Sequence, residues 1–304
     1  MSRRTGMLMM VAAWAVGLAA GNAEAWHGKG HHVATRLAVA AAGERMPVFF
    51  REGAATVAHC SLDPDLFTRP IGPEPLHSAE APEHYFDLEL LKGQTPPATR
   101  YEFLALCARK GLAPNKVGLL PYAVSEWTRR LTVALAEHRA GPGNRHVRMK
   151  CLVYAGLLSH YAEDLCQPLH VTIHWDGRSD ADGNSPRTGI HTKVDALLGK
   201  LSPKAPAVLK GLGVEPVQDL LPGVLAEIGR SHRLVESVYQ LAKDLPDLAK
   251  PLPADGPVRA FASERLRAAV RFTASLYVTA WRDSATIKLP SWYSRSDGPA
   301  RGPR

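Results

Sequence analysis

The sequence has little that would support a β-sheet, a thiolate metal site or a membrane-spanning segment. Alternation of apolar and polar residues, which is typical of half-buried strands, is scarce along the 304 residues. There are only four cysteines and no Cys-x-x-Cys pair, which argues against zinc bound by thiolates. Beyond residue 25, no segment has the roughly 18 consecutive apolar residues of a transmembrane helix. We therefore expect a helical protein whose chemistry depends on other side chains.

The first 25 residues have the three parts of a secretory signal. Two arginines near the start are followed by an apolar run over 7–20, and Ala23 and Ala25 supply the small residues of a cleavage site. Cleavage between Ala25 and Trp26 predicts a secreted or periplasmic protein that begins at Trp26. Export also permits disulfides, and the four cysteines allow three pairings, which the sequence leaves open.

Apolar residues recur with a helical period over most of the remaining chain, and proline and glycine punctuate it. The predicted helices cover 31–42, 117–138, 146–164, 221–245 and 261–281, and the predicted loops cover 63–82, 141–144, 176–189 and 251–256. No repeat or change in composition divides the chain. We expect a single all-α domain over 26–290, a disordered tail over 291–304, and a monomer.

The charge balance favours anionic partners. Without residues 1–25, which hold two arginines and one glutamate, 35 basic side chains stand against 28 acidic ones. This excess would suit nucleic acid or a phospholipid surface, but an ordinary basic exported protein explains it equally well.

Histidines followed four residues later by a carboxylate are more frequent than chance predicts. Such spacing puts both side chains on one face of a helix, where they can hold one ion. The chain has four of these pairs: His59 with Asp63, His160 with Asp164, His191 with Asp195, and His232 with Glu236. The last lies between two arginines, which favours a solvated surface pair over a metal site.

The surroundings of two pairs favour a metal site. His160 and Asp164 end an apolar helix, and Pro168 must then turn the chain just before His170. His191 and Asp195 open a new helix after a glycine-rich loop, in GIHTKVDALL.

Four elements, in order, resemble the zinc-dependent S1/P1 nuclease and bacterial phospholipase C superfamily. They are WHGKGH, EHYFD, HYAEDLCQPLH and GIHTKVD, and they span residues 26–195. The resemblance implies a mostly helical fold with three Zn²⁺ ions in one cleft. It implies these ligand sets: the amine and carbonyl oxygen of Trp26 with His31 and Asp164; Asp65, His84, His160 and a shared Asp164; and His170, His191 and Asp195.

Imidazole and carboxylate ligands suit zinc, which lowers the pKa of bound water to about 7 and can polarise a phosphoryl oxygen. We therefore expect in-line hydrolysis of a phosphate ester without a covalent intermediate. Asp65 and Asp164 would serve catalysis as metal ligands, and Asp87 would either support a metal ligand from behind or orient water. A position often occupied by histidine in these nucleases holds Cys166, but it is not a ligand position.

Several assignments have alternatives. His31 is preferred to His32 because of its distance from the N-terminal tryptophan in the family. Asp65 is preferred to Asp63, although both are expected in the same loop. His84 matches the family element but would also suit a buried, hydrogen-bonded core histidine.

The substrate class is open between two phosphodiesters. Tyr85, Trp175 and Asn184 are candidate substrate-binding residues, with packing as the alternative role of the aromatic rings. The Gly-Asn step at 183–184 and the positive charge favour single-stranded DNA or RNA, whereas GIHTKVD is closer to the phospholipases. A non-catalytic zinc-binding helical protein is the third hypothesis. Base preference and internal versus end cleavage stay open.

Overall fold

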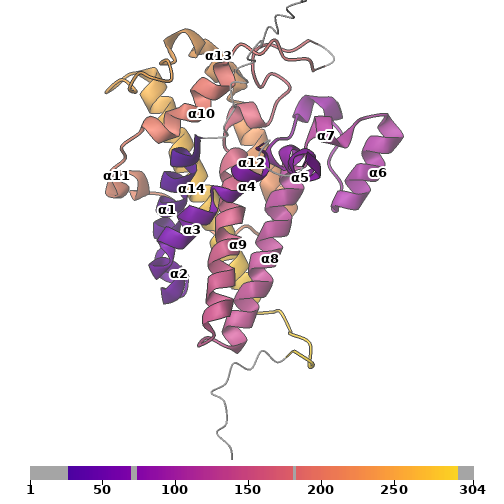
Figure 1. Ribbon diagram of the computed structural model, residues 1–304, viewed down its shortest axis with the longest axis vertical. Coiled ribbons are helices and arrows are strands. Elements are labelled where there is room, and N and C mark those ends of the chain that lie inside the picture. Colours follow the sequence, from indigo (N-terminus) through magenta and orange to yellow (C-terminus); the bar gives the residue numbers. More distant parts are fainter. Residues whose placement is uncertain (1–26, 70–73, 181–182, 294–304) are drawn as a thin grey trace, which may run out of the picture.

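The computed structural model describes residues 27–69, 74–180 and 183–293, and in these the chain is helical without any strand (Figure 1). The all-α expectation is confirmed. The main α-helices are α1 His27–Ala42, α2 Val48–Glu52, α3 Ala54–Cys60, α4 Asp63–Phe67, α5 Glu74–Glu80, α6 Arg100–Lys110, α7 Pro114–Val117, α8 Leu120–Ala140, α9 Arg145–Asp164, α10 Ile190–Lys200, α11 Ala205–Leu209, α12 Leu220–His232, α13 Val235–Gln240 and α14 Pro257–Ser284. Short 3₁₀ turns include η2 Ala81–His84, η3 Leu88–Leu91 and η4 Pro168–His170.

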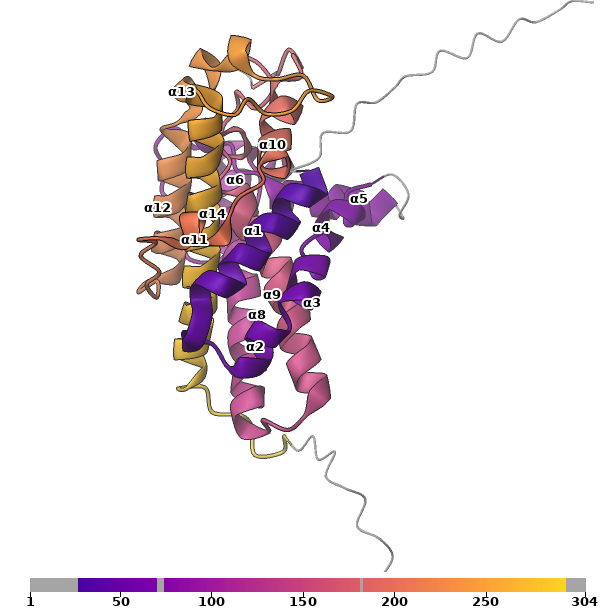
Figure 2. The same cartoon turned by 90° about the vertical axis from the view of Figure 1, so that its left-hand side faces the viewer.

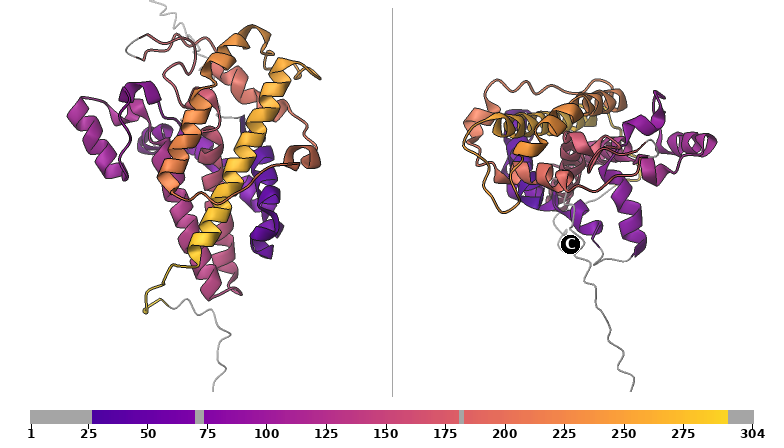
Figure 3. Two further views of the ribbon diagram at one scale, coloured as in Figure 1. Left: turned by 180° about the vertical axis from the view of Figure 1, so that it is seen from behind. Right: turned by 90° about the horizontal axis from the view of Figure 1, so that it is seen from above.

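A hairpin of α8 and α9 forms the centre of the molecule (Figure 1). The Asn144 side chain starts α9 by accepting hydrogen bonds from the backbone N–H groups of His146 and Val147, which otherwise lack partners in the first helical turn. The long α14 crosses both helices from behind, and α1 packs against α14, α10 and α3 (Figures 2 and 3). The C-terminal half of α9 therefore packs against α1, α4 and the 3₁₀ turn η2.

Two apolar clusters form the core, and their separation explains one wrong expectation. The first lies around α8 and α9 and includes Ile228 of α12, whereas the second lies between α10 and α14 and includes Val238 of α13. The single helix predicted over 221–245 is in fact α12, α13 and a 3₁₀ turn, η5 Ala242–Asp244, with a break of two residues between α12 and α13. The break lets each part pack on a different cluster.

The loop predicted over 63–82 is also wrong in part, because it contains α4 and α5. Pro64 and Pro75 each stand in the first turn of these helices. There the missing proline N–H costs nothing, and the fixed φ favours the helix. Proline therefore starts these helices instead of interrupting them, and α4 gives Asp65 a fixed place on a helix.

Gly156 allows α3 to approach α9 closely. A Cβ at this position would lie 2.5 Å from the Cβ of Cys60 and 2.6 Å from the carbonyl oxygen of Val57. The close approach brings Ser61 and α4 to the side of α9 that carries His160. The glycine therefore belongs to the scaffold of the site described below.

We predict that Gly156→Ala lowers the free energy of unfolding by about 1–3 kcal/mol, because the added methyl group must displace backbone. Urea denaturation followed by circular dichroism would measure this. Gly143→Ala is the control, since nothing lies within 4 Å of the Cβ it would add. Equal stability of the two variants would contradict the role given to Gly156.

Among the described residues, no helix combines the length and the apolar character needed to cross a membrane. The proposed signal peptide, Trp26 and residues 294–304 of the expected tail lie outside the described residues.

Candidate metal centre

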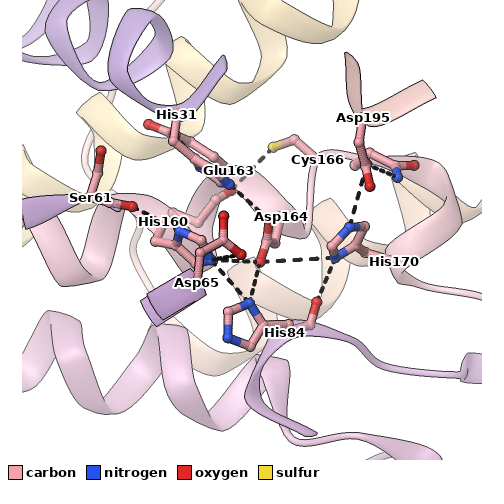
Figure 4. Close-up of polar contacts among 12 residues, drawn as sticks. His31, Ser61, Asp65, His84, His160, Glu163, Asp164, Cys166, His170 and Asp195 are labelled. Atoms are coloured by element: carbon pink, nitrogen blue, oxygen red, sulfur yellow. Dashed lines mark hydrogen bonds and ion pairs between the residues drawn. The ribbon is translucent and has the colours of Figure 1, made fainter. Parts of the chain in front are cut away.

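Eight histidine and aspartate side chains converge at the C-terminal end of α9, and Figure 4 labels seven of them, all but His191. They come from segments far apart in the sequence, and each is at most 9% exposed. They form three groups in which one ligand atom per residue lies within 4.8 Å of the others: His31, His160 and Asp164; Asp65, His84 and His160; and His170, His191 and Asp195. All eight were expected from the sequence as metal ligands.

Asp164 lies at the centre of the first two groups. Its Oδ1 is 3.3 Å from Nε2 of His31. Its Oδ2 is 3.1 Å from Nδ1 of His84 and 3.3 Å from Nε2 of His160. Asp65 completes the second group, with its Oδ1 3.9 Å from Nε2 of His160. The two oxygens of Asp164 thus face His31 on one side and His84 and His160 on the other, which is the arrangement of a bridging ligand.

The third group joins the turn after α9 to the start of α10. Nε2 of His191 is 3.0 Å from Oδ2 of Asp195, and Nε2 of His170 is 3.7 Å from its Oδ1. The two imidazole rings are stacked with their centroids 4.9 Å apart. Gln167 donates a hydrogen bond of 2.7 Å to Asp195 Oδ1 and so holds this carboxylate in place.

Hydrogen bonds orient the imidazoles of this cluster. Nδ1 of His160 lies 2.8 Å from the carbonyl oxygen of Ser61, and Nδ1 of His170 lies 2.7 Å from that of His84. Nδ1 of His191 lies 3.3 Å from the carbonyl oxygen of Trp175. A carbonyl only accepts, so each Nδ1 must carry the proton. The lone pair of each Nε2 then points toward the carboxylates, as in a ligating histidine.

The cluster also contains buried polar atoms without a hydrogen-bond partner. They include Nε2 of His31, Nε2 of His170, Oδ1 of Asp164 and Oδ2 of Asp195. Such atoms cost free energy unless something satisfies them. Two ligands of one zinc ion can lie up to about 4 Å apart, since each bond is about 2 Å long. The individual pairs of ligand atoms given above are 3.0–3.9 Å apart and fit that limit. The residues present therefore fit bound metal ions.

Without a metal, two histidines of the cluster are protonated and so form ion pairs with the neighbouring carboxylates. Burial lowers the pKa of His31, but the neighbouring carboxylates of Asp164 and Glu163 outweigh burial and raise that pKa to about 10. The pKa of His84 is likewise lowered by burial and raised to about 9 by Asp164 and Glu80. Burial and the neighbouring His31 lower the pKa of His160, because adjacent imidazoles resist carrying a charge together.

We predict that metal binding at pH 7 releases protons, because His31 and His84 are charged in the metal-free chain and must lose a proton to bind. In the metal-free chain, both raised pKa values stabilise the fold below pH 6.5, and this contribution is lost as the pH rises through 9 and 10. Calorimetric titrations with Zn²⁺ in buffers of different ionisation enthalpy would count the protons. Binding without proton release would contradict these protonation states.

The alternative residues differ in their positions. His31 belongs to the cluster, whereas His32 is only half-buried. Burial lowers the pKa of His32, and the positive charge of the nearby Arg36 lowers it further. Asp65 belongs to a group that could hold a metal, and Asp63 does not. Both aspartates lie on α4 and not in a loop.

Asp87 lies beside the third group. The Phe86 N–H donates to the carbonyl oxygen of His170 at 2.8 Å, and the Asp87 N–H donates to that of Val117 at 2.7 Å. These bonds fix the segment next to His170. Burial raises the pKa of the Asp87 carboxyl to about 8, and the charge of Glu89 adds to this effect.

The three candidate substrate-binding residues differ in their positions. The Trp175 indole packs edge-on against His191, with centroids 5.6 Å apart, so it adjoins the third group. The Tyr85 hydroxyl donates to the carbonyl oxygen of Asn115. The exposed Asn184 donates from Nδ2 to Asp180 at 2.9 Å. Of the three, Trp175 has a ring contact with a member of the cluster.

Two further sequence features lie outside the candidate centre. His232 pairs with Glu89, and Glu236 pairs with Arg178, so each has a partner of its own. The expectation of one surface pair between them is therefore corrected to two ion pairs. All four cysteines are free and buried, and Cys166 donates its thiol to the Ala162 carbonyl oxygen at 3.4 Å.

Three side chains that support the cluster were missed from the sequence. Glu163 contacts His31, Gln167 contacts Asp195, and Glu80 has Oε1 3.6 Å from Nε2 of His84. Gln167 lies within the family element HYAEDLCQPLH, which could have indicated its role. Nothing in the spacing separates the two glutamates from ordinary surface acids.

Comparison of the chain with protein-family models found no match, and the search of curated proteins found no significant match. Any statement about function therefore depends on the sequence motifs and on the geometry of the site.

Proposed function

We propose that the chain is an exported zinc-dependent phosphodiesterase of the S1/P1 nuclease and phospholipase C superfamily, and that it hydrolyses single-stranded DNA or RNA. The observation that carries this proposal is the convergence of five imidazoles and three carboxylates, several of whose buried ligand atoms have no hydrogen-bond partner. A cluster of this composition has the ligand chemistry of zinc. The motifs that suggested the family contain seven of the eight residues.

The proposed centre holds three ions. The first would bind Trp26, His31 and Asp164, the second would bind Asp65, His84, His160 and the shared Asp164, and the third would bind His170, His191 and Asp195. Bound zinc would supply activated water and polarise the phosphoryl oxygen of a phosphodiester. The chain's own residues would present their Nε2 and carboxylate oxygen atoms in fixed directions. Asp87, held next to His170, would orient the attacking water.

Nucleic acid is favoured over phospholipid by two features. The chain without residues 1–25 has seven more basic than acidic side chains, which would attract a polyanion along its length. Trp175 lies against His191, where an aromatic face could stack on an unpaired base. A single strand can spread its bases into a recessed site more readily than a duplex can.

The test compares single-stranded DNA, RNA and phosphatidylcholine micelles as substrates of the chain that begins at Trp26, with and without chelator. We expect hydrolysis of the nucleic acids, its loss with chelator, and its recovery with Zn²⁺. Heat-denatured DNA should react faster than supercoiled duplex. Release of phosphocholine alone would favour phospholipase, and zinc binding without hydrolysis of any substrate would favour the non-catalytic hypothesis.

A matched pair of variants links the activity to the cluster. His191→Ala removes a member of the third group, whereas His59→Ala removes an exposed histidine that also precedes an aspartate by four residues. We expect the first to lose activity and the second to keep it. Similar activities would dissociate the reaction from the cluster.

A further inference from the structure

A glutamate outside the proposed ligand sets lies directly behind one of the histidines. Glu163 precedes Asp164 on α9 and is completely buried. Its Oε2 is 2.8 Å from Nδ1 of His31, and both side chains are labelled in Figure 4. Its Oε1 accepts a hydrogen bond of 2.8 Å from the Thr35 hydroxyl. Thr35 stands one turn after His31 on α1. Both oxygens of the carboxylate are thus held by the helix that carries the histidine.

The buried position of Glu163 would be energetically unfavourable if its side chain served only to fill space in the core. Burying a carboxylate costs free energy, and the adjacent negative charge of Asp164 adds to that cost. A leucine would avoid both costs, and a glutamine would avoid the charge. The hydrogen bonds to His31 and Thr35 offset part of the cost, which implies that the charge serves the histidine.

The contact also decides which nitrogen of His31 faces the cluster. The Glu163 carboxylate accepts a hydrogen bond from Nδ1, so Nε2, which faces Oδ1 of Asp164 at 3.3 Å, is the nitrogen that can bind a metal ion once it has lost its own proton. Nε2 is one of the buried atoms without a hydrogen-bond partner. Histidines of the third group instead bond to backbone carbonyl oxygens, which carry no full charge.

We propose that Glu163 is a positioning residue of the metal centre, which fixes the orientation and tautomer of His31 and strengthens it as a ligand. A carboxylate behind a ligating histidine raises the basicity of the imidazole, and loss of such a partner typically weakens metal binding by about 10–100-fold. The inference rests on the proposed metal centre, but it does not depend on the identity of the substrate.

The test measures zinc affinity of the chain that begins at Trp26 by competition with a chromogenic chelator. In Glu163→Gln, the shape is kept and the charge removed, so we expect one of the zinc ions to bind about 10–100-fold more weakly. Substitution with Co²⁺ gives a second readout, because the visible spectrum of the site that contains His31 should change. Glu163→Asp keeps the charge and should restore part of the affinity.

Glu137→Gln is the matched control, because Glu137 is also a buried carboxylate but pairs with Lys150 at the opposite end of the α8 and α9 hairpin. Its zinc affinity and Co²⁺ spectrum should equal those of the unaltered chain. If Glu163→Gln fails to fold, Thr35→Val tests the same contact by removing the bond to Oε1, and severalfold weaker zinc binding is expected.

Unchanged zinc affinity and an unchanged Co²⁺ spectrum in Glu163→Gln would overturn the inference. Weaker binding in this variant, together with no phosphodiesterase activity in the unaltered chain, would refute the proposed function and leave the inference standing. Absence of metal binding by the unaltered chain would refute both.

Discussion

Asp164→Asn is expected to remove two of the three zinc ions and to lower phosphodiester hydrolysis by about 1000-fold, or roughly 4 kcal/mol of transition-state stabilisation. Its two oxygens face His31 on one side and His84 and His160 on the other. An asparagine keeps only one oxygen and turns an NH₂ group toward one of these imidazoles. Neither group then has a complete set of ligands. Zinc content and kcat/KM with single-stranded DNA would measure the effect.

The control for this substitution is Asp63→Asn, which makes the same chemical change at an aspartate outside the three groups. It should keep three zinc ions and its activity. His31→Ala should remove only one ion and cost less than Asp164→Asn. If Asp164→Asn and His31→Ala bind equal zinc and react equally fast, Asp164 is not a bridging ligand.

Retaining Ala25 ahead of Trp26 is expected to remove one zinc ion and to lower activity by roughly 100-fold. The proposed ligand is the free amine of Trp26, and an additional residue converts this amine into an amide, which has no lone pair to offer. α1 begins at His27 and carries His31, the partner proposed for the same ion. Zinc content would be compared between chains that begin at Ala25 and at Trp26.

The matched control for the extended chain is removal of the added residue by a specific aminopeptidase, which should restore both zinc and activity. Equal zinc content and equal activity before this treatment would show that the terminal amine is not a ligand.

The sequence predicted the long helices well, because α1, α8, α9 and α14 each bury a continuous stripe with a helical period. Short helices such as α2 and α7 were missed, since each buries only one residue and leaves no periodic pattern. α6 had a usable signal in the Thr99 and Glu102 capping box, in which each side chain bonds to the backbone of the other residue.

The candidate site was predictable where it is local in sequence. His160, Asp164 and His170 lie within eleven residues, and helix geometry with Pro168 brings them together. Asp65 and His84 reach the cluster through the packing of α4 and η2 on α9, which no local pattern encodes. Their assignment therefore depended on the family resemblance.

Glu163 shows the limit of helical spacing as a guide. It stands three residues after His160 and next to Asp164, so the helix period places it near the same face without assigning a contact. The contact exists because α1 packs against α9 with His31 and Thr35 toward the carboxylate. Tertiary packing, and not the spacing of residues on α9, determines which atom the carboxylate meets.

Anomalous X-ray diffraction at the zinc edge, from crystals of the chain that begins at Trp26, tests the central claim most directly. The account predicts three zinc peaks, one at each of the three groups of histidine and aspartate residues, with Asp164 between two of them. Crystals grown with zinc in excess that show no peak among these side chains would contradict it.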